Sequence, residues 1–280
     1  MTERNSSATA RGVAMLRAAH QLIDGEPPIL NDPAIVRIFG PDLEAHIHES
    51  IEMYQSPQSR GLRSHVVLRS RYAEDALHDA VTRGIKQYIL LGAGLDTFAY
   101  RQPDWARDIT IVEVDHPASQ GEKRAMLRRA GIEAPPNVHY ADVDFERETL
   151  AEGLARCRVA FDVPSFFSWL GVTMYLTREA IAAVLNTVSS FPRGSGIALT
   201  FAQPADPSEP GAGLLAERAA ELGEPWLSYF TPEEIRELLL SHGFTHAELA
   251  DRAEIMKRYY AGRRDGLLPP RRVSMALATT

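Results

Sequence analysis

The sequence contains little of several features that mark particular classes of protein. Its 280 residues include one cysteine, Cys157, which excludes an intrachain disulfide and a cysteine-rich zinc site and indicates a reducing compartment. Positive charge is not in excess, because 30 Lys and Arg stand against 37 Asp and Glu, a formal net charge of −7. Since phosphate backbones are bound by cationic surfaces, we expect no nucleic-acid partner.

Long apolar runs are also missing. No stretch of about 18 apolar residues occurs, and residues 1–10 lack the basic start and apolar run of a secretory leader. We therefore expect no membrane span and no export, with the cytoplasm as the default location. The apolar share of 45% is that of an ordinary soluble globular protein.

The apolar residues that are present predict an α/β fold. Before any strand, helices are expected over 8–23, 35–54 and 61–83, where apolar residues recur at helical spacings. Short continuous apolar runs follow, separated by segments long enough for crossover helices, which is typical of buried parallel strands. These runs cover 88–91, 109–114, 138–145, 165–170 and 197–201, and a last, antiparallel strand is expected over 272–278.

The second half of the chain carries two further helix signals and one insertion. A helix is expected over 177–191, and Thr231, Pro232 and Glu234 predict another by forming a capping box, with Gly243 at its end. A Pro-, Gly- and Glu-rich stretch indicates a lid insertion rather than a linker. We therefore expect one domain made of a helical cap (1–86), a cofactor-binding core (87–202), a lid insertion (203–228) and the C-terminal part of the sheet (229–280).

A glycine turn follows the first predicted strand. Gly92, Ala93 and Gly94 stand where a backbone can approach a ligand that a side chain would exclude. The third glycine of the dinucleotide fingerprint is replaced by Thr97, which disfavours NAD and FAD, and no Walker A pattern follows.

Acidic residues stand at the ends of the next two predicted strands. Asp115 ends the second, where a carboxylate can accept hydrogen bonds from ribose hydroxyls, and Asp142 and Asp144 end the third, where an acid beside an apolar residue suits adenine. Taken singly, each feature is equally compatible with a tight turn or a helix cap. Their order on successive strands favours a ligand with a ribose and a base but no phosphate, such as S-adenosylmethionine.

These residues belong to a longer set of motifs that resembles the leucine carboxyl methyltransferase family, in particular its actinobacterial branch of S-adenosylmethionine-dependent methyltransferases. The resemblance extends from about residue 10 to the C-terminus. The motifs that carry it are residues 69–75 (RSRYAED), 87–101, 113–117 (EVDHP), 143–146 (VDFE), 166–176, 223–228 (GEPWLS) and 260–267 (YAGRRDGL).

The resemblance implies a Rossmann-like class I methyltransferase with a seven-stranded, mostly parallel sheet, a helical N-terminal cap and a late lid insertion. Arg71 would then pair with the methionine carboxylate, while Gly92, Ala93 and Gly94 would line the methionine and ribose. Asp115 would hold the ribose, and Asp144 and Phe145 would meet the adenine. Without the motif, Arg71 would instead be expected to pair with Asp75 on the helix surface.

One position departs from the family pattern. Members that methylate a peptide's terminal carboxylate have an acidic residue before the glycine of the fourth-strand motif, where this chain has Leu170. The departure leaves the expected activity as O-methylation of a carboxylate or hydroxyl on a small-molecule acceptor, for instance in secondary metabolism. The alternatives are a fold that binds the cofactor for sensing or another reaction, and a nicotinamide oxidoreductase, which Thr97 contradicts.

Few catalytic side chains are obligatory, because methyl transfer mainly requires alignment and exclusion of water. His116, Tyr175 and Tyr229 are weak catalytic candidates, although His116 could simply cap a turn. Trp226 and Tyr229 could form an apolar wall for the acceptor. We expect no metal site, since the spacing of the histidines is unsuitable for shared ligation.

Overall fold

The computed structural model describes residues 8–144, 147–206 and 213–280. Seven strands form one sheet in the order β3-β2-β1-β4-β5-β7-β6, in which β7 runs opposite to the other six. The strands are β1 (Gln87–Leu91), β2 (Thr110–Asp115), β3 (Val138–Asp142), β4 (Phe166–Trp169), β5 (Gly196–Thr200), β6 (His246–Leu249) and β7 (Met275–Thr279). The mostly parallel seven-stranded sheet expected from the sequence is confirmed.

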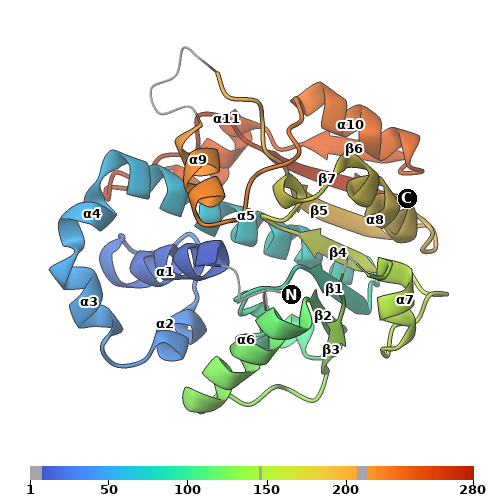
Figure 1. Ribbon diagram of the computed structural model, residues 1–280, viewed down its shortest axis with the longest axis horizontal. Coiled ribbons are helices and arrows are strands. Elements are labelled where there is room, and N and C mark those ends of the chain that lie inside the picture. The colour runs from blue at the N-terminus through green and yellow to red at the C-terminus, as the bar shows by residue number, and fades with distance from the viewer. Residues whose placement is uncertain (1–7, 145–146, 207–212) are drawn as a thin grey trace.

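Helices cover both faces of the sheet, and those of the first quarter of the chain gather at one side of the molecule (Figure 1). The α-helices are α1 (Ala8–Ile23), α2 (Pro33–Phe39), α3 (Leu43–Glu49), α4 (Ile51–Gln55), α5 (Pro57–Thr82), α6 (Pro117–Arg129), α7 (Leu150–Ala155), α8 (Arg178–Ser189), α9 (Leu214–Glu221), α10 (Pro232–Ser241) and α11 (Arg252–Ile255). Short turns are η1 (Phe98–Tyr100), η2 (Asp104–Ala106), η3 (Thr173–Tyr175) and the π-helical η4 (Met256–Tyr260).

The single helix expected over 35–54 was wrong. The chain forms α2, α3 and α4 there instead, so that five α-helices rather than three precede β1 within the described residues. Gly40 and Pro41 end the first of them, and Ser50 separates the other two. The apolar spacing was correctly helical, but it continued across breaks that the periodicity alone does not register.

Two apolar layers flank the sheet. One face packs against α7, α8 and α10, with Phe167, Trp169 and Leu185 fully buried. The other face packs against α5, where Ala73, Leu77 and Ala80 lie against Tyr88 and Leu90. Since α5 leads through a short turn into β1, its N-terminal half extends beyond the carboxyl ends of the strands. No helix in the described residues is long and apolar enough to cross a membrane.

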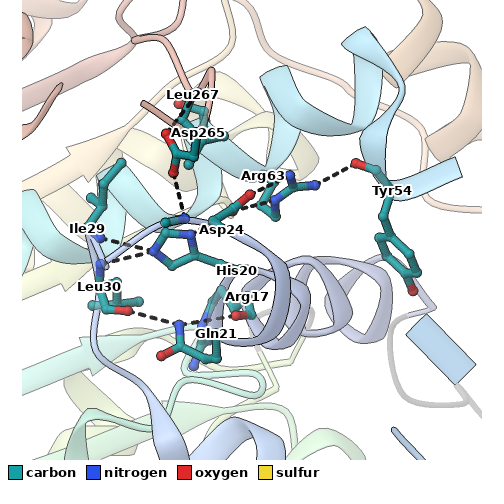
Figure 2. A network of polar contacts seen from close by, with 12 residues as sticks. Arg17, His20, Gln21, Asp24, Ile29, Leu30, Tyr54, Arg63, Asp265 and Leu267 are labelled. Atoms are coloured by element: carbon teal, nitrogen blue, oxygen red, sulfur yellow. Dashed lines mark hydrogen bonds and ion pairs between the residues drawn. The ribbon is translucent and has the colours of Figure 1, made fainter. Parts of the chain in front are cut away.

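The end of α1 is joined to α5 by a dense polar network (Figure 2). His20 Nε2 accepts the amide hydrogen of Ile29 at 3.0 Å, so its ring carries the proton on Nδ1 and donates to Asp24, 2.8 Å away. Arg63 of α5 donates to both carboxylate oxygens of Asp24 at 2.7 and 2.8 Å and to the carbonyl of Tyr54 at 2.7 Å. These contacts fix the angle between the two helices.

A second polar cluster joins the cap to the loop after β1. Asp32 is fully buried and accepts hydrogen bonds from Arg17 (3.1 Å), the Thr97 hydroxyl (2.6 Å) and the amide of Ile35 (3.1 Å), and its other charged neighbour is Arg101 at 3.3 Å. Burial opposes ionisation of Asp32, but the two guanidinium groups outweigh it and lower its pKa. Thr97, which stands where the dinucleotide fingerprint has its third glycine, therefore has a structural role as a hydrogen-bond donor to Asp32.

We predict that Asp32→Asn lowers the free energy of unfolding at pH 7 by about 3–5 kcal/mol, because Arg17 would lose its buried counter-charge. A lowered carboxyl pKa stabilises the fold above the ordinary value of about 4, and this stabilisation is lost as the pH falls through the folded-state value. The difference between wild type and variant should therefore shrink below about pH 4, as measured by urea denaturation across a pH series.

The matched control is Asp104→Asn. Asp104 pairs with Arg107 on the surface, where its side chain is 92% exposed, so its loss should change the unfolding free energy by less than about 0.5 kcal/mol. Equal losses in the two variants would contradict the role given to Asp32.

Candidate active site

The glycine turn closes β1 onto the end of β2. The amides of Gly92 and Ala93 both donate to the carbonyl of Val114, at 2.8 and 3.0 Å. Gly92 has φ +67°, and a Cβ there would lie 2.4 Å from a methyl group of Val172, so no other residue fits without a shift. The turn lies where the strand order reverses between β1 and β4, which is where parallel α/β sheets bind ligands.

Asp115 ends β2 directly beside this turn. One carboxylate oxygen accepts a short hydrogen bond from the amide of Gly94, and the other accepts the amide hydrogen of His116 at 2.7 Å. Burial raises the pKa of Asp115, although both amide bonds act in the opposite direction. Because each carboxylate oxygen has a second lone pair, two hydroxyl donors can still bind.

The two acidic residues at the end of β3 and just beyond it, Asp142 and Asp144, have different surroundings. Asp142 pairs in register with Asp115 and its side chain is exposed, whereas Asp144 is partly buried, 3.9 Å from the ring of His116. The structure therefore brings Asp144 toward the end of β2, as expected. Phe145, its expected partner at the adenine, lies outside the described residues.

His116 has the structural role that the sequence left open. It is the N-cap of α6, and its Nδ1 accepts the amide hydrogen of Ala118 at 3.2 Å. That hydrogen bond places the ring at the helix start beside Asp144. A capping role accounts for His116 without any catalytic one.

Arg71 does not lie toward the glycine turn. It forms an ion pair with Asp75 at 2.9 Å, and its side chain is 44% exposed. Together with Arg258 and Tyr259 of η4 it lines a cavity of about 510 Å³ between α5, residues 25–29 and residues 258–265. The helix-surface pairing with Asp75, which the spacing allowed, is what the structure shows.

Arg69 is a residue of α5 that the sequence analysis did not single out. It stands two residues before Arg71 on α5, and therefore points to nearly the opposite side of the helix. A Cβ at Gly171, the residue two beyond the end of β4, would lie 2.6 Å from its guanidinium, so the guanidinium packs directly on the backbone there. It makes no hydrogen bond and no ion pair with any described residue.

The surroundings of Arg69 are polar but do not neutralise it. Burial, and then the charge of Arg17, lower the pKa of Arg69 to about 10, whereas Tyr175 and Asp96 act to raise it. Tyr175 and Asp96 therefore lie within electrostatic reach of the guanidinium. An unpaired guanidinium fork in a partly buried position is suited to binding a carboxylate in two places.

Part of the expected lid contacts the same end of the sheet. The amides of Leu227 and Ser228 donate to the carbonyl of Met174 at 2.6 and 3.2 Å, which docks this segment onto η3. The rings of Trp226 and Tyr229 lie 6.1 Å apart, and Trp226 Nε1 is covered without a partner among the described residues. The Trp226 and Tyr229 rings are thus brought together on a segment that is docked onto η3, the turn that contains Tyr175.

The start of α1 covers the other side. A Cβ at Gly94 would lie 3.8 Å from that of Ala10, and the amide of Thr9 donates to Glu224 at 3.4 Å. Figure 1 shows α9, which precedes Glu224, beside α1. In the described part of the chain, no three His, Cys, Asp or Glu side chains are grouped as a metal site requires.

Comparison with known proteins places these features in a family. The sequence profile described as leucine carboxyl methyltransferase matches residues 10–189. A Bacillus subtilis protein named as an inferred S-adenosyl-L-methionine-dependent methyltransferase, YktD, is 36% identical over 209 residues, covering 71% of this chain and 67% of its own. A Mycobacterium avium protein with the same kind of name is 32% identical over 232 residues, covering 78% and 72%.

Solved structures confirm the fold. A DUF574 family protein from Streptomyces avermitilis superposes with a TM-score of 0.60 at 15% identity, covering 98% of both chains. An inferred methyltransferase from Thermobifida fusca gives 0.58 at 20% identity, covering 96% of this chain and 94% of its own. The sequence profile spans well over half of the chain, and the curated relatives agree with it. The chain therefore belongs to the leucine carboxyl methyltransferase family.

Proposed function

We propose that the protein transfers the methyl group of S-adenosyl-L-methionine to an oxygen of a small-molecule acceptor. The methyltransferase class and the cofactor, both expected from the sequence, are confirmed by the family and by the names of the relatives. The observation that carries the proposal is the partly buried Asp115 carboxylate, held by the Gly94 amide at the glycine turn with lone pairs left for two hydroxyl groups.

The residues present fit this cofactor. Asp115 would hold the ribose hydroxyls, Gly92, Ala93 and Gly94 would leave room for the ribose and methionine, and Asp144 would lie toward the adenine. We propose Arg69, in place of Arg71, as the partner of the methionine carboxylate, because its guanidinium is unpaired and packs on Gly171 at the strand ends.

The mechanism requires mainly binding and alignment from the protein. S-adenosyl-L-methionine supplies an electrophilic methyl group on a sulfonium sulfur. Arg69 and Asp115 would anchor the two ends of the donor, so that the methyl group points to one fixed place. Trp226 and Tyr229 would cover the acceptor and exclude water.

Other sequence-based expectations remain proposals. These are a single domain with the cap, core and lid boundaries given above, a cytoplasmic location and an acceptor from secondary metabolism. The single cysteine, Cys157, supports a reducing compartment. The continuous seven-stranded sheet, which includes strands from both halves of the chain, supports a single domain.

Calorimetric titration with S-adenosyl-L-methionine and S-adenosyl-L-homocysteine, with NADH as a control, tests the cofactor site. We expect micromolar binding of the first two only, about −8 kcal/mol. Asp115→Ala should weaken binding by more than about 1 kcal/mol, the cost of losing a charged hydrogen-bond partner. Asp142→Ala, in register on β3 but exposed, should leave it unchanged.

Each contrary result has a definite meaning. Binding of NADH alone would replace the methyltransferase proposal with a nicotinamide enzyme. Absence of binding to all three compounds would indicate a fold used for another purpose. Equal binding by wild type and a folded Asp115→Ala variant would remove Asp115 from the site.

A second prediction decides between the two arginines of α5. Arg69→Met should weaken binding of S-adenosyl-L-homocysteine at least tenfold, because the methionine carboxylate would lose its charged partner. Arg71→Met should change it less than twofold, since Arg71 is paired with Asp75 on the other side of the helix. Titration of both variants measures this, and the reverse ranking would restore Arg71 as the carboxylate partner.

A further inference from the structure

His65 of α5, like Arg69, is a partly buried polar side chain without a hydrogen-bond partner among the described residues. His65 is four residues before Arg69, so the two side chains lie on one face of the helix. Its ring makes no hydrogen bond, ion pair or ring contact with any described residue, and the side chain is partly buried. Two neighbouring polar groups without partners are uncommon in a folded interior, where such groups are nearly always hydrogen-bonded.

Both side chains remain reachable from solvent. Among the described residues, the covered side-chain atoms without a partner are Thr9 Oγ1, Gln120 Oε1 and Trp226 Nε1. The nitrogens of His65 and Arg69 are not among them, although both residues lie deep enough for burial to shift their pKa values. His65 and Arg69 are therefore deep side chains whose polar atoms are not fully covered.

The position of His65 along α5 places it on the acceptor side. Arg69 lies at the strand ends, packed on Gly171, and α5 extends away from the sheet toward its N-terminus. One helical turn carries His65 about 6 Å farther out than Arg69. If the methionine end of the cofactor lies at Arg69, as proposed above, His65 faces the space from which an acceptor approaches.

The charges at this end of the sheet disfavour a carboxylate acceptor. Arg17 is bound to Asp32 and to the Leu95 carbonyl, and Arg101 is bound to Glu74. Arg69 would be taken by the methionine carboxylate. None of these three guanidinium groups is then free for a second carboxylate, whereas the His65 ring still offers a nitrogen that can accept a hydrogen bond.

The state of the imidazole agrees with an accepting role. Burial, together with the charge of Arg69, lowers the pKa of His65 to about 3, so the ring is neutral at physiological pH. A neutral imidazole has one nitrogen with a free lone pair. Aromatic side chains at the same end of the sheet, Trp226, Tyr229 and Tyr175, favour a flat partner.

We propose that His65 is a catalytic residue that accepts the hydroxyl proton of the acceptor, and that the acceptor is an aromatic hydroxyl compound, a phenol. This inference rests on the proposed function and names the substrate class of the same site.

The step balances without a further reactant. A lone pair of the phenol oxygen forms the new bond to the methyl carbon, and the carbon–sulfur bond breaks with its electron pair remaining on sulfur. The hydroxyl proton passes to the His65 ring and then to water. Because methylation makes this proton strongly acidic, a weakly basic imidazole is sufficient to remove it.

The test uses the purified full-length protein with S-adenosyl-L-methionine and three matched pairs of probes. The phenols are 1-naphthol, 2-naphthol and 4-nitrophenol, and the acids are 1-naphthoic, 2-naphthoic and 4-nitrobenzoic acid. Methylated products are measured by mass spectrometry. We expect transfer to at least one phenol and to none of the acids.

Variants then assign the proton transfer to His65. His65→Gln should lower the rate of transfer to the phenol at least 100-fold, the scale of general base catalysis, while the Kd for S-adenosyl-L-homocysteine stays within twofold. Imidazole added to His65→Ala should restore part of the rate. His78→Gln, an exposed histidine farther along α5, is the matched control and should change neither quantity.

A binding measurement provides a readout independent of turnover. The complex with S-adenosyl-L-homocysteine should bind 4-nitrophenol about tenfold more tightly than the same complex of His65→Gln, since one hydrogen bond is lost. The Kd of each complex is measured from the change in absorbance of 4-nitrophenol on binding.

Three results would overturn the proposal while leaving the proposed function intact. They are transfer to the acids, transfer to phenols that His65→Gln does not slow, and no transfer to any phenol by a protein that binds S-adenosyl-L-homocysteine. Failure to bind S-adenosyl-L-homocysteine would instead overturn the proposed function, and the inference with it.

Discussion

The arrangement of the site depends on one buried carboxylate. Asp32 is completely enclosed, and a charge in that position is stable only if cationic and hydrogen-bonding groups surround it. Its partners come from α1, from the loop after β1 and from the start of α2. Arg101, beside it, is bound in turn to Glu74 of α5. The helical cap, the glycine turn and α5 therefore form one connected structure.

This connection explains how α5 holds polar side chains in fixed positions at the carboxyl ends of the strands. Its C-terminal half is held against the sheet by apolar contacts, and its N-terminal half is held by Arg63, which binds Asp24 and the Tyr54 carbonyl. With both halves fixed, the rotation of the helix about its axis is also fixed. One face must then look toward Gly171, and the groups on that face are Arg69 and His65.

Rotation of a helix is also where prediction from sequence reached its limit. Six of the seven strands and the glycine turn were predictable, because each is encoded by a short contiguous run and by the rule that parallel strands end at one edge. The strand β6 was not predicted, because its four residues alternate in burial instead of forming an apolar run. Asp115 was placed correctly beside the turn for the same reason. The choice between Arg69 and Arg71 was different, because it depends on which side of α5 faces the sheet, and apolar spacing indicates this only coarsely. His65 and Arg69, for which we propose functional roles, were not singled out, since in the sequence only their spacing of four residues connects them. The break of the 35–54 helix was missed because Gly40 and Pro41 interrupt a pattern whose apolar spacing continues.

The distribution of charge has a further consequence for specificity. Arg17 and Arg101 lie near the cofactor site, yet both are committed to Asp32 and Glu74, so they support the fold and cannot also select an anionic acceptor. Recognition of the acceptor is then left to one neutral imidazole and to the aromatic groups of η3 and the lid segment, which discriminate by shape and by single hydrogen bonds. In a site of this kind, an acceptor that leaves a polar group of the protein without a hydrogen bond binds more weakly. Changes in residues 226–229 should therefore alter which acceptor is used while leaving the cofactor end, held by the Asp32 cluster, as it is.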